Sequence, residues 1–177
     1  MAPDRSLTVF EEDLLLWVHD DATVARIVSD LTELERLATV AVVVLVVLLA
    51  LRRSTDAMFF VAGVGVVWAV NPLLKQLVGR SRPDLWPLPP EVSEYSFPSG
   101  HAANTAALVG ALVLILYPRP AAVLLGAAVL LAVGWSQLAL GRHYPTDVLA
   151  AWVWALAWLW ALSRVGALRN VTKGGPG

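Results

Sequence analysis

Three ionisable side chains of this sequence have the types and the spacing of a nucleophile, an orienting carboxylate and a proton donor. His143 and Asp147 are four residues apart, so they share one face if the segment is helical. A carboxylate on one imidazole nitrogen fixes the tautomer and leaves the other nitrogen free to attack an electrophile. His101 is a second imidazole and could serve as a general acid. The three residues therefore predict catalysis by a nucleophilic histidine.

Other polar residues at the ends of the long apolar runs are suited to holding an anion. Lys75 and Arg82 lie close to such a run, where an unpaired charge is costly, so an anion is their simplest partner. Ser99 and Gly100 open the next run and are predicted to form a helix N-terminus, where free N–H groups and the helix dipole favour phosphate. Glycine also lets the backbone approach the anion closely. These residues predict a phosphate-binding cradle beside the histidines.

The elements that must position this cluster are apolar segments long enough to cross a bilayer. A helix of about 20 residues is about 30 Å long, which matches the hydrocarbon thickness. Five segments meet this requirement and are predicted as spans: residues 32–51, 57–78, 99–117, 121–140 and 145–162. Because consecutive spans alternate in direction, the polar residues at the ends of the second and fourth spans and at the starts of the third and fifth fall on the same side of the membrane.

The overall composition also favours a membrane protein. Apolar residues make up 58% of the chain, charged residues only 15%, and the mean hydropathy is +0.67. A net charge of −1 gives no reason to expect a nucleic-acid partner, and the lack of cysteine excludes disulfides and thiolate metal sites. Three histidines are too few for a histidine-rich metal site. The predicted fold is an all-α integral membrane helical bundle, and no metal or other cofactor is predicted.

The chain is predicted to divide into three parts. Residues 1–36 form an amphipathic N-terminal segment, residues 37–163 the membrane bundle, and residues 164–177 a polar, frayed tail. The N-terminal segment is not continuously apolar, and its apolar residues recur at roughly helical spacing. One or two helices lying at the membrane surface, or packed against the bundle, account for this pattern equally well.

Two pairs of residues in the N-terminal part have the spacing of a capping box, in which a hydroxyl side chain and a carboxylate three residues later satisfy the first backbone N–H groups of a helix. They are Thr8 with Glu11, and Thr32 with Glu35. The sequence therefore predicts that helices begin at these two positions.

Basic residues indicate an orientation in the membrane. If the loop over residues 79–98 faces outward, the opposite side carries Arg52, Arg53, Arg119 and the basic tail, with Asp56 as its only acid. Lys and Arg counts alone do not separate the two sides, but several basic residues on the loop side belong to the predicted catalytic cluster. The positive-inside rule then favours a plasma (inner) membrane protein with its site on the extracytoplasmic side.

Three separated motifs occur in a diagnostic order: Lys, six residues and Arg-Pro; then Pro-Ser-Gly-His; then Ser, six residues, His, three residues and Asp. The residues that form them are Lys75, Arg82, Pro83, Pro98, Ser99, Gly100, His101, Ser136, His143 and Asp147. In order and spacing, the motifs resemble those of the type 2 phosphatidic acid phosphatase (PAP2) family, which also includes the vanadium haloperoxidases. The resemblance extends over roughly residues 37–162, including the helical-bundle layout.

The resemblance implies a role for each residue of the cluster. His143 would be the nucleophile that forms a phosphohistidine, Asp147 would orient it, and His101 would protonate the leaving oxygen. Members of this kind need no divalent metal. The phosphate oxygens would be held by Lys75, Arg82, Ser99 and the amide of Gly100.

Gln137 departs from the family pattern, which has arginine after the serine of the third motif. Glutamine can donate neutral hydrogen bonds but carries no charge. Arg142 lies beside the nucleophile in the sequence and could supply the missing charge. Gln137 and Arg142 are therefore both included among the predicted phosphate-binding residues.

The leading function predicted for the chain is hydrolysis of a lipid phosphate. A polyprenyl (di)phosphate, a polyprenyl-linked phosphate, phosphatidic acid and phosphatidylglycerophosphate all fit as substrates, and the bilayer is the expected partner. Two alternatives remain: a vanadate-dependent haloperoxidase-like enzyme, against which the five spans argue, and a non-catalytic lipid-phosphate binder or transporter. The sequence leaves the choice of lipid and the oligomeric state open.

Overall fold

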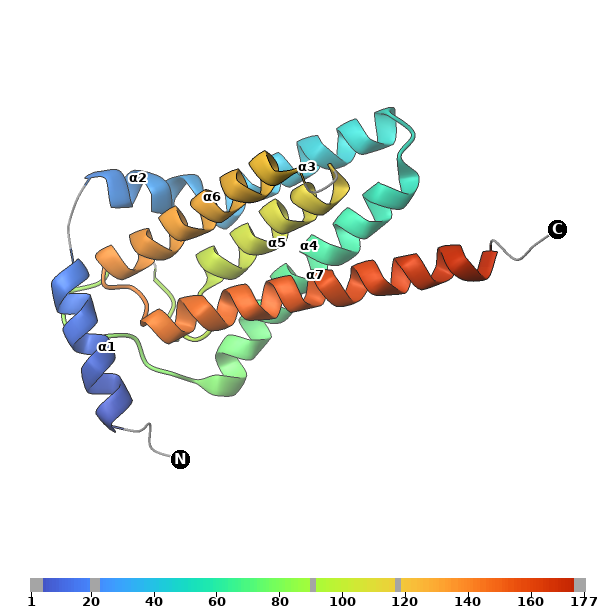
Figure 1. The fold of residues 1–177 in the computed structure, drawn as a ribbon. Helices are drawn as coiled ribbons and strands as arrows, with labels where there is room; N and C mark the ends of the chain where they lie inside the picture. The colour runs from blue at the N-terminus through green and yellow to red at the C-terminus, as the bar shows by residue number, and fades with distance from the viewer. Residues whose placement is uncertain (1–4, 20–22, 90–91, 117–118, 174–177) are drawn as a thin grey trace.

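A computed structural model describes residues 5–19, 23–89, 92–116 and 119–173, with side chains between residues 9 and 165 in these ranges. Over this part of the chain the protein is all-helical, as predicted, with one isolated bridge between Ser81 and Tyr95 as its only strand-like pairing. The helices are α1 Arg5–Val18, α2 Thr23–Leu31, α3 Leu34–Ala50, α4 Ser54–Val78, α5 Gly100–Ile115, α6 Pro120–Ala139 and α7 Pro145–Lys173 (Figure 1).

The five helices α3 to α7 coincide with the five predicted spans and form the bundle. Three of them are long and apolar enough to cross a membrane: α4, α6 and the part of α7 over Pro145–Val165, with mean hydropathies of 1.9, 1.9 and 1.5. Helices α3 and α5 are shorter, with 17 and 16 residues. The prediction of an integral membrane helical bundle is confirmed, whereas the number of five spans stays a prediction.

Small residues allow the bundle to pack closely around α5. Its buried positions include Ala102, Ala103, Ala106, Ala107 and Ala111, all without exposed surface. Helix α5 contacts α3, α4, α6 and α7, and it lies between them in Figure 1. Small side chains are the usual means by which membrane helices approach one another, because lipid provides no hydrophobic force between them. The central position of α5 fixes its N-terminus, Ser99 and Gly100, among the ends of its neighbours.

The outer surface of the bundle is apolar, which suits contact with lipid. Leu124, Leu131 and Val153 are each more than 60% exposed, and they lie on helices that qualify as spans. In water such a surface would be a large exposed hydrophobic patch, which soluble monomers avoid. The outward faces therefore agree with the hydropathy of the helices.

Two glycines close the helices that lead to the polar end of the bundle. Gly79 follows α4 and Gly141 follows α6, with φ angles of 61° and 62°, which an L side chain rarely adopts. At Gly141 a Cβ atom would also lie 2.5 Å from the ring of Trp86. Both chain reversals therefore depend on glycine, and they turn the loop of residues 79–98 and the segment before α7 back over the bundle.

The N-terminal helices α1 and α2 both pack against α6. Leu15 and Ala25 are fully buried on the packed side, whereas Phe10 and Trp17 are 65% and 84% exposed on the other. In Figure 1, α1 lies across the end of the bundle at which α7 begins. The helices thus pack on the bundle with one face and expose apolar side chains on the other. That the exposed face lies at the membrane surface stays a prediction.

The capping-box predictions are wrong at both positions. Helix α1 begins at Arg5, so Thr8 lies inside the helix, and Glu11 makes tertiary contacts instead. Thr32 donates its hydroxyl to the carbonyls of Val28 and Ser29 and so closes α2. The N-cap of α3 is Glu33, with no side-chain cap. Local spacing failed because other partners compete for the same side chains. For Thr32 they are carbonyls of the preceding turn, and for Glu11 they are residues far along the chain.

The division of the chain at residue 163 stays a prediction, although the segment that follows it is mostly helical. Helix α7 continues without a break to Lys173, so most of the predicted tail, residues 164–177, is helical. Backbone i to i−4 hydrogen bonds can continue after the apolar pattern ends, because they do not depend on side-chain polarity.

The close crossing of α6 and α7 leads to a stability prediction. A Cβ atom at Gly134 would lie 2.6 Å from the ring of Trp152 and 3.1 Å from Val148. We expect Gly134→Ala to lower the free energy of unfolding by about 1–3 kcal/mol, the usual cost of overpacking. At Gly65 a Cβ atom meets nothing within 4 Å, so Gly65→Ala should be neutral or stabilising. Thermal unfolding in detergent would compare the two, and equal midpoints would contradict the close packing.

Candidate active site

A cavity of about 680 Å³ opens at the polar end of the bundle. Its lining comes from the end of α4, the start of α5, the end of α6, the loop of residues 79–98 and the connection between α2 and α3. Seven of the nine predicted site residues line it: Lys75, Arg82, Gly100, His101, Gln137, Arg142 and His143. The other two, Ser99 and Asp147, are fully buried. The structure therefore brings together residues that lie up to 72 positions apart in the sequence.

His143 and Asp147 form a buried pair at the start of α7. Nδ1 of His143 lies 3.4 Å from Oδ2 of Asp147, slightly beyond an ordinary N–H···O hydrogen bond, and the two side chains are 3% and 0% exposed. The backbone N–H of Tyr144 donates to the same carboxylate oxygen at 2.9 Å. Burial lowers the pKa of His143, and the nearby carboxylate only partly opposes this effect. The imidazole is therefore neutral at physiological pH.

The tautomer of His143 follows from its second neighbour. Nη1 of Arg82 lies 3.2 Å from Nε2 of His143. A guanidinium can only donate, and although burial lowers the pKa of Arg82 to about 10 it remains protonated at neutral pH. The contact with Arg82 therefore favours a lone pair on Nε2, and the Asp147 carboxylate favours the proton on Nδ1. This is the tautomer in which Nε2 can act as a nucleophile.

Lys75 and Arg82 are held by backbone carbonyl groups, most of them in the loop of residues 79–98. Lys75 Nζ donates to Tyr95 O at 2.9 Å and to Ser96 O at 3.4 Å. Arg82 donates to the carbonyls of Ser93, at 2.5 Å, and of Arg142. Carbonyls orient the cations without neutralising them.

The charge of the cavity lining is positive. Three cations, Lys75, Arg82 and Arg142, face one acid, Glu33. The Glu33 carboxylate lies at the surface, 3.7 Å from Arg36. The balance of charge around the cavity therefore favours an anionic ligand.

The start of α5 is a helix N-terminus, as the sequence predicts, and its role as an anion site stays a prediction. Ser99 is the N-cap, and its side chain accepts from the N–H of Ala102 at 3.5 Å. Gly100 is the first helical residue, and a Cβ atom there would make only ordinary contacts with Asn71 and Lys75. Packing within the protein therefore does not require glycine at this position. Because Gly100 lines the cavity, the absence of a side chain there leaves more room inside it. Nε2 of His101 is buried and lacks a hydrogen-bond partner among the described residues.

Gln137 and Arg142 converge on a residue that the sequence did not indicate, Ser29 of α2. Nε2 of Gln137 lies 3.2 Å from Ser29 Oγ, and Nη1 of Arg142 donates to the same oxygen at 2.9 Å. Gln137 also donates to Ser136, whose hydroxyl in turn donates to the carbonyl of Val133. The N-terminal segment thus contributes directly to the site.

Arg80 and Glu11 are also missing from the predicted set. Arg80 donates to Asp147 Oδ1 at 2.8 Å, and its other terminal nitrogen donates to Glu11 Oε2 at 2.7 Å. The available signal for Arg80 was its place in the first motif, two residues before Arg82. For Glu11 and Ser29 no local pattern exists, because their partners lie more than 65 residues away.

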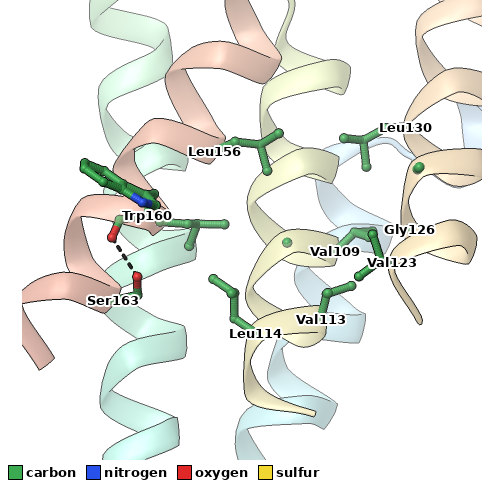
Figure 2. Close-up of a pocket in the computed structure, with 12 residues that line it drawn as sticks. Val109, Val113, Leu114, Val123, Gly126, Leu130, Leu156, Trp160 and Ser163 are labelled. Atoms are coloured by element: carbon green, nitrogen blue, oxygen red, sulfur yellow. Dashed lines mark hydrogen bonds between the residues drawn. The ribbon is translucent and has the colours of Figure 1, made fainter. Parts of the chain in front are cut away.

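A second cavity, of about 320 Å³, lies between α5, α6 and α7. Figure 2 shows that its lining is mainly aliphatic, with the hydrogen bond from Ser163 to the carbonyl of Trp160 as its polar feature. It contains no charged side chain. Of these two cavities, only the first is lined by ionisable side chains.

The fold and the site define a helical integral membrane protein with a buried His143–Asp147 pair beside a cavity lined by cations. The chain belongs to the PAP2 superfamily, which its sequence matches over residues 55–170. The matched region contains the whole of the three motifs. It leaves out α1 and α2, which supply Glu11 and Ser29.

Comparison with known proteins gives several relatives. Phosphatidylglycerophosphatase B of Bacillus subtilis is 33% identical over 106 residues, which cover 55% of this chain and 52% of the relative. Decaprenylphosphoryl-5-phosphoribose phosphatase of Mycobacterium tuberculosis is 35% identical over 100 residues, 55% of this chain and 54% of the relative. The chain thus spans about half the length of these curated relatives.

A solved structure supports the assignment of the fold. The crystal structure of a transmembrane PAP2-type phosphatidylglycerolphosphate phosphatase from Bacillus subtilis aligns with a TM-score of 0.69 and 23% identity, covering 92% of this chain and 94% of that one. At this level of identity the likeness concerns the fold, and it extends beyond the family match into the N-terminal helices.

Proposed function

We propose that this protein is a membrane phosphatase that removes phosphate from a lipid phosphate or diphosphate through a phosphohistidine, without a metal. The observation that carries the proposal is the position of His143 Nε2. It holds a lone pair, lies 3.2 Å from the Arg82 guanidinium, and belongs to a cavity with cationic lining. A nucleophile beside cations is suited to attack on phosphorus, because the attacked group is itself an anion.

The first step breaks the bond between phosphorus and the lipid oxygen. Nε2 of His143 attacks phosphorus, and the leaving oxygen takes a proton from His101. Asp147 stabilises the positive charge that develops on the imidazole. In the second step water attacks the phosphohistidine, returns a proton to His101 and releases inorganic phosphate. Lys75, Arg82, Arg142 and the N-terminus of α5 offset the charge on the equatorial oxygens.

The class of substrate follows from the surroundings of the site. The cavity lies at the ends of apolar helices, so a lipid can keep its tail in the bilayer while its phosphate reaches His143. The named relatives act on phosphatidylglycerophosphate and on a decaprenyl-linked phosphoribose. Both contain a phosphomonoester on a lipid, and this shared chemistry is what we propose for the present chain.

The first prediction tests the nucleophile. His143→Ala should abolish release of phosphate from a panel of lipid phosphates in metal-free buffer, because it removes the imidazole that forms the proposed covalent intermediate. Ser163→Ala, near the opposite end of α7, should keep wild-type turnover. Orthovanadate should inhibit, since its trigonal-bipyramidal form resembles the phosphoryl transition state. Undiminished turnover of the His143 variant would exclude the mechanism.

The second prediction concerns the charge absent at Gln137. Arg142 provides a guanidinium in the same cavity, and loss of one such donor commonly costs on the order of 10²–10³ in rate. We expect Arg142→Ala to approach that loss in kcat. Gln137→Arg should not raise kcat, because Arg142 already supplies a guanidinium in the same cavity. Kinetics of both variants and of the double variant would decide, and a mild effect of Arg142→Ala would rule out compensation.

The third prediction concerns orientation. We propose that the cavity faces the extracytoplasmic side of the plasma membrane, which the basic residues Arg52 and Arg53 at the opposite end of the bundle support. The chain has no native cysteine, so single cysteines can be introduced at Leu88 and at Thr55. In intact cells an impermeant thiol reagent should label the variant at Leu88 and spare the variant at Thr55. The reverse pattern would place the cavity in the cytoplasm.

A further inference from the structure

Glu11 of α1 is a buried acid with all of its described contacts at the catalytic end of the bundle. It is 1% exposed. Its Oε2 accepts from Arg80 at 2.7 Å, and its Oε1 accepts from the backbone N–H of Thr146 at 3.0 Å and from the Thr146 hydroxyl at 2.5 Å. A buried carboxylate is costly unless it is paired and hydrogen-bonded, and here both oxygens are satisfied.

Arg80 connects this acid to the catalytic carboxylate. One terminal nitrogen of its guanidinium donates to Glu11, and the other donates to Asp147 Oδ1 at 2.8 Å and to the Thr146 hydroxyl at 2.6 Å. The guanidinium also lies over the ring of Tyr144, 4.0 Å from its centre. Arg80 is thus fixed between two carboxylates, and Asp147 is fixed between Arg80 on one oxygen and His143 on the other.

The charges explain why a second acid is needed. An arginine paired with Asp147 alone would draw the carboxylate toward itself and neutralise the charge that orients His143. Glu11 divides the hydrogen bonds of Arg80 between two acids and offsets its charge. His143 Nδ1 and Asp147 Oδ2 are already 3.4 Å apart, so a further displacement of the carboxylate would break their interaction.

We propose that Glu11 is a positioning residue for the reaction and acts on His143 through Arg80 and Asp147. The proposal rests on the proposed function of the site. Glu11 does not line the cavity, so it does not touch the substrate. An amphipathic N-terminal helix, outside the region matched by the family, is then part of the catalytic apparatus of this chain.

The competing explanation is that Glu11 only fastens α1 to the bundle. Leu15 separates the two explanations, because it is fully buried on the same helix but has no charge. Leu15→Ala should loosen α1 by loss of apolar packing while leaving the ion pairs in place. Asp13 is an exposed acid on the same helix, so Asp13→Asn controls for a change in net charge.

The test compares full-length variants in lipid nanodiscs. Glu11→Gln keeps the shape of the side chain and removes its charge. We expect kcat for a lipid phosphate to fall roughly 10- to 100-fold, the range in which small misplacements of catalytic groups act, with KM unchanged. Glu11→Asp should restore part of the loss, and Asp13→Asn should keep wild-type kcat. Leu15→Ala should lower the thermal midpoint more than it lowers the kcat of the folded protein.

A second measurement needs no substrate. In protein labelled with 15N-histidine, chemical shifts report the tautomer of each of the three histidines. Glu11→Gln should reduce the population of His143 with its proton on Nδ1. Arg80→Lys keeps the positive charge but cannot donate to Glu11 and Asp147 from two separate nitrogens, so it should reduce the same His143 population. If Glu11→Gln does not fold, the Arg80→Lys variant takes its place in this measurement.

Two results would overturn the proposal. In the first, Glu11→Gln has the kcat and the His143 tautomer of the wild-type protein. In the second, Glu11→Gln and Leu15→Ala lose kcat equally and the His143 tautomer is unchanged. Failure of the proposed function has a different signature. In that case the wild-type protein would release no phosphate from the lipid panel, while the tautomer measurement would still decide whether Glu11 positions His143.

Discussion

Asp147 has no exposed surface, and a buried carboxylate is tolerated only when it is fully paired. Its oxygens contact Arg80, the N–H of Tyr144 and the imidazole of His143. Its backbone carbonyl accepts from the N–H of Ser99 at 3.1 Å, which joins the start of α7 to the start of α5. The same residue therefore contacts the proposed nucleophile and joins two of the three motifs.

The surroundings of Asp147 explain why the site is positive. Arg80 is neutralised by two acids, whereas Lys75 and Arg82 are held by loop carbonyls that orient them but carry no net charge. The cations that line the cavity thus keep their charge for a ligand. In a bundle whose outer faces are apolar, an anion that arrives with its own lipid tail satisfies both the cations and the surrounding bilayer.

The motifs and the helices could be predicted because both depend on short-range patterns. A run of apolar residues of bilayer length specifies a helix by itself, and alternation of spans brings the ends of α4 and α6 together with the starts of α5 and α7. Cap chemistry was less reliable. The helix N-terminus at Ser99 was predicted correctly because the apolar run that follows it marks where α5 begins, whereas Glu11 was misassigned because its partners Arg80 and Thr146 lie far along the chain.

The sequence by itself determined the class of fold, the three motifs and the side of the bundle on which they meet, since residue type and spacing carry that information. Only the tertiary structure decided how α1 and α2 complete the site. Ser29 contacts residues 108 and 113 positions away, and Glu11 contacts residues 69 and 135 positions away. Contacts over such separations follow from how helices pack, because packing depends on the shapes and charges of several elements together and no periodicity within one segment records it.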